Sequence, residues 1–250
     1  MQSPRNTAGA YSRLFERVGA LLGTRIELVQ RRTYREVNEL LVTGQLDAAL
    51  LCTGGYLELQ RGSPSDFEVL AVPQVGGKTT YQSVVIVGTS SDAMTLAELA
   101  DRRFAFTDEL SLSGHSYTVF ALREMHEDPL DFFSSTVFTN SHDRSIDAVA
   151  NGIVDGASVD GLIYEYREDR EPAITEKTRV IQRSPPLGIM PIVAAPGLSV
   201  ESRRRLREVL LNLGQDPEAS EVLFVIGIER FVVPAPDLYE EAARVVAGAR

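Results

Sequence analysis

Three apolar, strand-like segments between residues 104 and 160 are each followed directly by polar residues that open a helix. The junctions lie at 106–115, 138–143 and 157–161, and each contains hydroxyl, imidazole or carboxylate groups. The first N–H groups of a helix have no partner within the helix and carry the positive end of its dipole. Because open α/β sheets bind ligands beyond the carboxyl ends of their strands, the three junctions predict one crevice suited to an anion.

The first fifty residues show the strand and helix rhythm of an α/β protein. Residues 25–29 alternate as a strand does, and Thr33 with Glu36 forms the capping box of a helix that ends before Gly44. Residues 48–52 form a continuous apolar run, which is typical of a strand covered on both faces. This order predicts right-handed βαβ units and mostly parallel sheets flanked by helices.

Two stretches indicate that the chain crosses between two lobes. The β-rich stretch 81–87 is a candidate crossing, and the turn at 185–188 is a candidate return. We therefore expect a discontinuous first lobe made of residues 1–87 and 186–250. The second lobe is expected at 88–185, with the ligand cleft between the two. Two α/β lobes joined in this way form a venus-flytrap architecture.

The composition limits the partners that such a chain can have. A formal net charge of −10 argues against nucleic acid or an anionic membrane, although a local set of donors still suits a small anion. No apolar run approaches the roughly 18 residues that a membrane helix needs. One cysteine excludes an internal disulfide, and three histidines without an H-x-x-x-H pair argue against a metal site, so we expect neither metal nor cofactor. The arginine run 203–205 falls on the polar face of a predicted helix and is expected to be solvated.

Five short phrases occur in one order along the chain and carry a resemblance to a known family. They are RTYREV at 32–37, GQLDAA at 44–49, YQSVVIV at 81–87, SLSG at 111–114, and SHD at 141–143 followed by Asp160. Together they resemble the solute-binding proteins of ABC importers for phosphonate, phosphite and phosphate. The resemblance implies a two-lobed, non-enzymatic, monomeric protein of the periplasm that captures a small phosphorus oxyanion for an ABC permease.

The amino terminus departs from the family pattern. Residues 1–5 are not followed by the apolar core of a secretory signal, and the apolar strand with which such proteins begin is not recognisable. We expect that the signal and the first strand have been removed or lost, which would leave the first lobe incomplete.

The first junction offers several groups to a tetrahedral oxyanion. The hydroxyls of Ser111 and Ser113 match the Ser/Thr-rich loop of the family. Backbone N–H groups at Gly114 and His115 add donors, and a glycine permits close approach of the backbone to a ligand. The alternative for Ser113 is that its side chain only caps the helix.

The remaining ligand contacts come from the resemblance. It places a ligand-contacting histidine at His142, which as an imidazolium would add a charge-assisted donor; the alternative is a surface or cap-stabilising histidine. It also matches Tyr34 and Tyr81 to ligand-contacting tyrosines, for which core packing is the alternative. Asp160 matches a position beside the pocket, where a carboxylate accepts a hydrogen bond only from a protonated ligand oxygen; its alternative is another helix cap.

Three functions remain open from the sequence. The favoured one is capture of phosphite, phosphate or an alkylphosphonate. The resemblance implies a carboxylate near segment 188–191 in members that bind aminoalkylphosphonates, and this segment carries no acid, so we expect a small uncharged tail. A sensory module with the same fold is the second. The third is a hydrolase using Ser113, a histidine and an aspartate, but no G-x-S-x-G elbow surrounds that serine.

Overall fold

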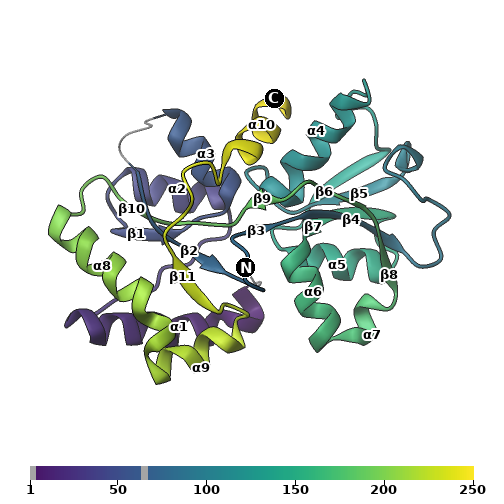
Figure 1. Cartoon of the computed structure of the whole chain (residues 1–250). Coiled ribbons are helices and arrows are strands. Elements are labelled where there is room, and N and C mark those ends of the chain that lie inside the picture. Colours follow the sequence, from purple (N-terminus) through teal and green to yellow (C-terminus); the bar gives the residue numbers. More distant parts are fainter. Residues whose placement is uncertain (1–3, 63–66) are drawn as a thin grey trace. The chain divides into compact units, whose positions relative to one another are not determined.

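The computed structural model describes residues 4–62 and 67–250 and divides into two compact units (Figure 1). The first lobe holds the described residues up to Thr80 together with Ile189–Leu238. The second lobe holds Tyr81–Gly188 together with Tyr239–Arg250. Among the helices of these described ranges, none has the length and apolar character needed to cross a bilayer.

The boundaries of the second lobe differ from those expected from the sequence. Residues 81–87 belong to it because strand β4 (Ser83–Gly88) pairs there with a strand on each side. The last helix, α10 (Glu240–Gly248), also belongs to it and packs against α4 (Tyr117–Glu124). Ala242 and Val245 of α10 are fully buried, so apolar burial fixes this helix to the second lobe.

The second lobe contains a five-stranded sheet with the order β6-β5-β7-β4-β8. Strand β5 runs parallel to both neighbours, whereas β4 runs antiparallel to β7 and β8. The other strands are β5 (Arg103–Phe106), β6 (Ser135–Phe138), β7 (Gly156–Asp160) and β8 (Thr178–Arg183). Since β5, β6 and β7 are parallel, their carboxyl ends meet at one edge of the sheet, as the sequence predicts.

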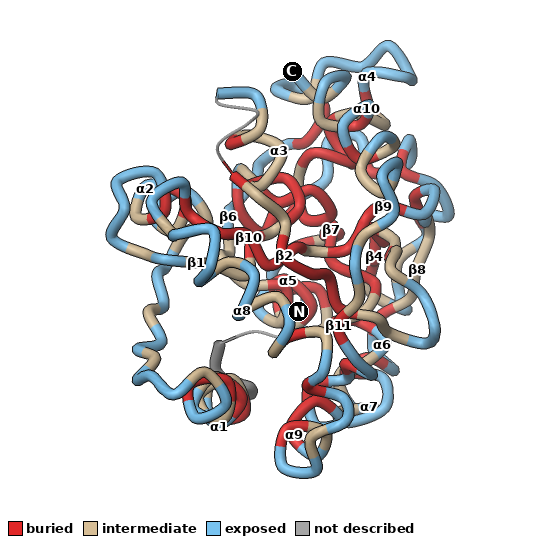
Figure 2. The backbone as a smooth tube through the Cα atoms, turned by 60° about the vertical axis from the view of Figure 1, so that its left-hand side comes forward, coloured by how far each residue is buried: buried red, intermediate tan, exposed pale blue. Residues whose placement is uncertain are grey.

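Strand β4 is apolar on both sides because helices cover both faces of this sheet. Val84 and Ile86 pack with residues of α5 (His142–Ala150) and α6 (Gly161–Arg170). Val85 and Val87 pack in a second cluster that includes Leu122 of α4 and a group of phenylalanines. The backbone is accordingly drawn as buried through β4 and β7 (Figure 2). The lobe is completed by η1 (Ala97–Leu99), η2 (Leu112–Ser116) and α7 (Pro172–Thr175).

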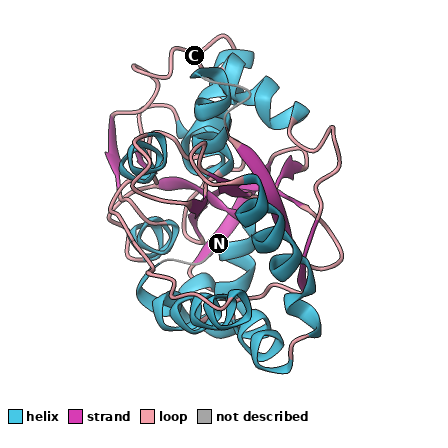
Figure 3. Ribbon diagram, turned by 90° about the vertical axis from the view of Figure 1, so that its left-hand side faces the viewer, coloured by secondary structure: helices cyan, strands magenta, loops and turns pink. Residues whose placement is uncertain are grey.

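The first lobe is built around a four-stranded sheet with the order β1-β10-β2-β11. Figure 3 colours the helices of the chain cyan and its strands magenta. Its elements are α1 (Pro4–Leu22), α2 (Tyr34–Val42), β1 (Ala48–Leu50), α3 (Thr53–Gly62), β2 (Glu68–Gln74), β10 (Ile192–Ala194), α8 (Val200–Asn212), η3 (Leu213–Gln215), α9 (Pro217–Val225) and β11 (Arg230–Val232). A separate two-stranded ribbon pairs β3 (Thr80–Tyr81) with β9 (Leu187–Gly188); Tyr81 and β9 belong to the second lobe. The predicted capping box of α2, between Thr33 and Glu36, is confirmed.

Two strand predictions for the first lobe are wrong. Every neighbouring pair in its sheet is antiparallel: β10 lies between β1 and β2 and runs opposite to both, and β11 runs opposite to β2. Residues 25–29 form no strand and lie mostly exposed between α1 and α2 (Figure 2). An alternating pattern forms a strand only where a neighbouring strand supplies hydrogen-bond partners, and no described strand pairs with this segment.

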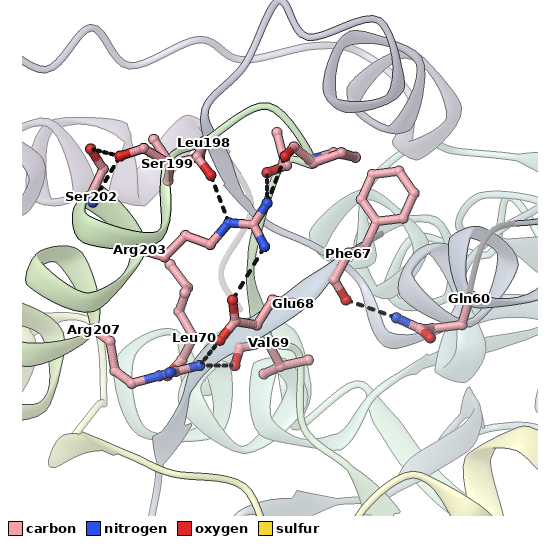
Figure 4. Close-up of polar contacts among 12 residues, drawn as sticks. Gln60, Phe67, Glu68, Val69, Leu70, Leu198, Ser199, Ser202, Arg203 and Arg207 are labelled. Atoms are coloured by element: carbon pink, nitrogen blue, oxygen red, sulfur yellow. Dashed lines mark hydrogen bonds and ion pairs between the residues drawn. The ribbon is translucent and has the colours of Figure 1, made fainter. Parts of the chain in front are cut away.

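Arginines of α8 hold the first lobe together. The arginine run 203–205 was expected to be solvated, and for Arg203 this expectation is wrong. Its guanidinium donates to the carbonyl oxygens of residues 195, 196 and 198 and pairs with Glu68 on β2 (Figure 4). One helical turn later, Arg207 donates to Glu68 at 2.6 Å and to the carbonyls of Val69 and Leu70. The neighbouring Arg204 pairs with exposed carboxylates of its own helix, Glu201 and Glu208.

Candidate anion-binding site

Thr107, the first residue after β5, joins the strand ends of the second lobe. Its N–H donates to the carbonyl of Gly114 at 2.9 Å, and its own carbonyl accepts from the N–H of Asn140 at 2.7 Å. Its hydroxyl lies 3.1 Å from Nδ1 of His142. Thr107, which has no distinctive signal in the sequence, therefore brings the first two junctions together.

The first junction opens with a short π-helix, η2. Ser116 N–H donates to the carbonyl of Ser111, and Tyr117 N–H donates to the carbonyl of Leu112, five residues back in each case. Such wide turns are rare and occur often at functional sites. The hydroxyl of Ser111 accepts the Gly114 N–H at 2.9 Å. Ser111 therefore caps this helix, and the alternative that Ser113 caps it is wrong.

Gly114 is required for packing rather than for approach to a ligand. A Cβ at this position would lie 2.5 Å from both Cβ and Oγ1 of Thr107, and 2.9 Å from the Ser111 hydroxyl. Its N–H is already bonded to Ser111. The glycine thus lets the anion loop, which we define as residues 111–116, lie directly on the end of β5.

The hydroxyl of Ser113, in the anion loop, remains available to a ligand. The side chain is almost fully buried, and among the described residues its hydroxyl has no hydrogen-bond partner. Its carbonyl oxygen accepts instead from the hydroxyls of Ser83 at 2.7 Å and Ser158 at 2.6 Å. Those two serines were not singled out from the sequence, although a hydroxyl within an otherwise apolar strand is a detectable signal.

His115 lies in an aromatic cluster. Its ring centroid is 4.8 Å from that of Phe106 and 5.5 Å from that of Phe138. Burial lowers its pKa, more strongly than the Glu109 carbonyl raises it. The side chain therefore packs as a neutral ring, and only the backbone N–H of His115 retains the expected role of an anion donor.

His142 is a neutral donor, which corrects the expected imidazolium. Its Nδ1 accepts the backbone N–H of Asp160 at 3.1 Å, so this nitrogen carries no proton. The ring proton then resides on Nε2, which can donate to a ligand. Burial lowers the pKa of His142 to about 3, so the ring remains uncharged throughout the physiological range.

Asp160 caps a helix, which is one of the two roles that the sequence left open; its contact with a ligand stays a prediction. One carboxylate oxygen accepts the N–H groups of Leu162 at 2.8 Å and Ile163 at 3.4 Å, which makes it the cap of α6. Its backbone N–H simultaneously orients His142. Burial raises the pKa of Asp160 to about 6, so this carboxyl changes charge close to neutral pH.

The second lobe thus brings together four of the eight predicted site residues: Ser111, Ser113, His142 and Asp160. Gly114 and His115 support the same loop by packing. Tyr81 is buried at the start of the second lobe, and Tyr34 is the first residue of α2 in the first lobe. Among the described residues, no group of three or more His, Cys, Asp or Glu side chains is arranged to hold a metal ion.

Comparison with known proteins gives the family. A family model described as "ABC transporter, phosphonate, periplasmic substrate-binding protein" matches residues 1–239. The chain belongs to this family. Its members are the periplasmic substrate-binding components of ABC transporters and not enzymes, so the hydrolase alternative is removed.

Individual relatives agree with the family assignment. The phosphate-import protein PhnD of Mycolicibacterium smegmatis is 26% identical over 170 residues, a match that spans 64% of this chain and 53% of the relative. The chain thus aligns with only about half the length of that curated relative. A binding protein of an ABC phosphonate transporter from Pseudomonas aeruginosa superposes with a TM-score of 0.88 at 21% identity, covering 98% of this chain and 82% of that one. PhnD1 of Prochlorococcus marinus, solved with methylphosphonate, superposes with a TM-score of 0.85 at 20% identity, covering 99% of this chain and 95% of that one. At such identities the two structures establish the two-lobed fold.

Proposed function

We propose that this phosphonate-family protein captures phosphite, phosphate or a short alkylphosphonate between its two lobes and delivers it to an ABC permease from the periplasm. The observation that carries the proposal is the set of donors at the strand ends of the second lobe. Ser113 supplies a hydroxyl, His142 supplies Nε2–H, and the starts of η2 and α5 supply backbone N–H groups. Tyr34 and Tyr81 complete the site in this proposal.

The charge of these groups favours a ligand that still carries a proton. Because His142 is neutral, these donors hold the anion through uncharged hydrogen bonds. The buried carboxyl of Asp160 is the acceptor in the set, and an acceptor is satisfied by a P–OH group but repels a fully ionised oxygen. We therefore propose that ligand and Asp160 share one proton.

The tail of the ligand is proposed to be short and uncharged. The return segment Gly188, Ile189, Met190 and Pro191 offers no carboxylate for an ammonium group. Burying an ammonium without a partner is costly, so 2-aminoethylphosphonate should bind more weakly than methylphosphonate or phosphite. Calorimetry in which the aminoalkyl compound is the tightest ligand would contradict this selectivity.

A thermal-shift panel of phosphite, phosphate, methylphosphonate and sulfate tests the function directly. A ligand that binds only the folded protein stabilises it by about 2.7 kcal/mol at a hundredfold excess over Kd. For a chain of this size each kcal/mol raises the melting temperature by roughly 2–4 °C, so we expect an increase of several degrees. No shift with any phosphorus oxyanion would contradict the proposal.

Capture between lobes also predicts compaction. Solution scattering should show a smaller radius of gyration when the tightest ligand of the panel is saturating. Ser113→Ala should weaken that ligand roughly tenfold to a hundredfold, because a hydrogen bond to a charged group contributes about 1.5–3 kcal/mol. Saturation without compaction would leave a binding site on one lobe alone.

A further inference from the structure

The carbonyl oxygen of Ser113 is held in an unusual way. In an α-helix it would accept the N–H of Tyr117, four residues later. In η2 that N–H goes to Leu112 instead. Two hydroxyl donors from the sheet, Ser83 and Ser158, bond to the Ser113 carbonyl. A buried carbonyl that lost these donors would be left unsatisfied or would have to find a new partner.

The two serines are built into the rigid part of the second lobe. Ser83 begins β4 opposite Asp160, and Ser158 lies in the middle of β7. Both are completely buried, and their hydroxyl oxygens are 3.3 Å apart. Ser83 is itself fixed by two bonds with Ser184, one from its N–H to the Ser184 hydroxyl and one from the Ser184 N–H to its carbonyl.

We propose that Ser83 and Ser158 are positioning residues that hold the anion loop in its π-helical form before ligand arrives. By bonding to the Ser113 carbonyl they keep it from the Tyr117 N–H, and the peptide so fixed sets the direction of the Ser113 hydroxyl. Without them the loop relaxes towards an α-turn in which Ser113 accepts from Tyr117. The relaxed loop no longer presents the Ser113 hydroxyl and the first N–H groups together. This inference rests on the proposed function for its ligand, but the loop conformation can be measured without one.

The first measurement is amide hydrogen exchange of the ligand-free protein carrying both Ser83→Ala and Ser158→Ala. We expect the hydrogen-bonded amides of Gly114, Ser116 and Tyr117 to exchange at least about tenfold faster than in the unchanged protein, while α6 keeps its protection. The matched control is Thr178→Val, which removes another buried hydroxyl of the same sheet, bonded to Tyr164 and Thr175 but not to the anion loop. It should leave exchange of residues 112–117 unchanged. Unaltered exchange of these residues in the double variant overturns the proposal, whatever the affinity.

The second measurement is a double-mutant cycle with methylphosphonate as probe. The two alanine substitutions should weaken binding about tenfold in the unchanged background, but less than about twofold when Ser113→Ala is already present, because they act through that residue. An equal loss in both backgrounds overturns the positioning role. If the unchanged protein binds none of the panel, the proposed function fails. The exchange measurement still decides whether Ser83 and Ser158 hold the anion loop in place.

Discussion

The two lobes are held in shape by different kinds of polar contact. At the edge of the second lobe, buried hydroxyls, one neutral imidazole and one buried carboxyl bond to one another and to backbone groups. In the first lobe, Arg203 and Arg207 bond to Glu68 and to carbonyls while remaining partly exposed (Figure 4). Buried contacts are directional and only weakly screened by salt, whereas partly exposed ion pairs are screened. The buried contacts of the second lobe therefore lie at the proposed ligand site, whereas the arginine contacts chiefly stabilise the first lobe.

The largest expected effect is that of Gly114→Ala in the second lobe. A Cβ placed 2.5 Å from Thr107 forces the anion loop away from β5, and over-packing of this kind costs about 1–3 kcal/mol. The melting temperature should fall by roughly 2–4 °C for each kcal/mol lost. Affinity for the tightest oxyanion should fall at least about tenfold. Gly9→Ala in α1 is the control, since nothing lies within 4 Å of a Cβ there. Wild-type affinity in the Gly114 variant would show that this packing does not shape the site.

The next effect concerns the pH dependence of binding. Burial raises the pKa of Asp160 to about 6, so above that pH the carboxyl is ionised. An ionised Asp160 accepts a hydrogen bond only from a ligand oxygen that still carries a proton. Affinity should fall as pH rises, when ligand and carboxyl are both ionised. Asp160→Asn keeps an oxygen to cap α6 but presents an N–H to the ligand, so it should bind the fully ionised form better. Calorimetry at pH 5.5 and 8.5 should therefore show the trend reduced or reversed in the variant. Parallel pH profiles for both proteins would exclude Asp160 from the ligand.

A smaller effect is expected in the first lobe. Burial raises the pKa of Glu68, but hydrogen bonds and charge from Arg207 and Arg203 outweigh it, so the net pKa is lowered. A lowered carboxyl pKa gives stability that is present at neutral pH and lost as pH falls through the folded-state value. Glu68→Gln should thus cost about 1 kcal/mol at pH 7 and almost nothing in strong acid.

Denaturant unfolding at low and high salt checks this prediction, with Glu201→Gln as control because its pair with Arg204 is exposed. Ligand affinity of the folded Glu68 variant should remain within about twofold of the unchanged protein. A large loss of affinity would break the separation between the two kinds of contact.

The smallest expected effect is an absence of change at His142. With its pKa lowered to about 3 by burial, the ring should remain neutral and protonated at Nε2 when pH is reduced from 8 to 5. Nitrogen-detected NMR of the histidine rings reports the tautomer and its titration directly. An imidazolium signal from His142 above pH 5 would restore the charged donor that the sequence first suggested and would contradict the neutral site.

Local patterns in the sequence determined a large part of this protein. The polar junctions at 106–115, 138–143 and 157–161, the capping box at Thr33, and the ordered family phrases all follow from residues close together in the chain. Neighbouring residues carry enough information for such features because helix starts and apolar strands are local. They sufficed for the family, for the α/β lobes and for the choice of Ser113, His142 and Asp160 as candidates.

Only the tertiary structure decided what depends on distant partners and on burial. The donors to the Ser113 carbonyl lie 30 and 45 residues away, and one buried serine cannot be told from another by its neighbours in sequence. The failure of residues 25–29 to form a strand depends on which strands are present to pair. The charge of His142 depends on complete burial and on a backbone N–H of residue 160. Hydrogen-bond partners and desolvation are properties of the folded environment, so they set the charge and the bonding of the proposed site residues, which the sequence could only name as candidates.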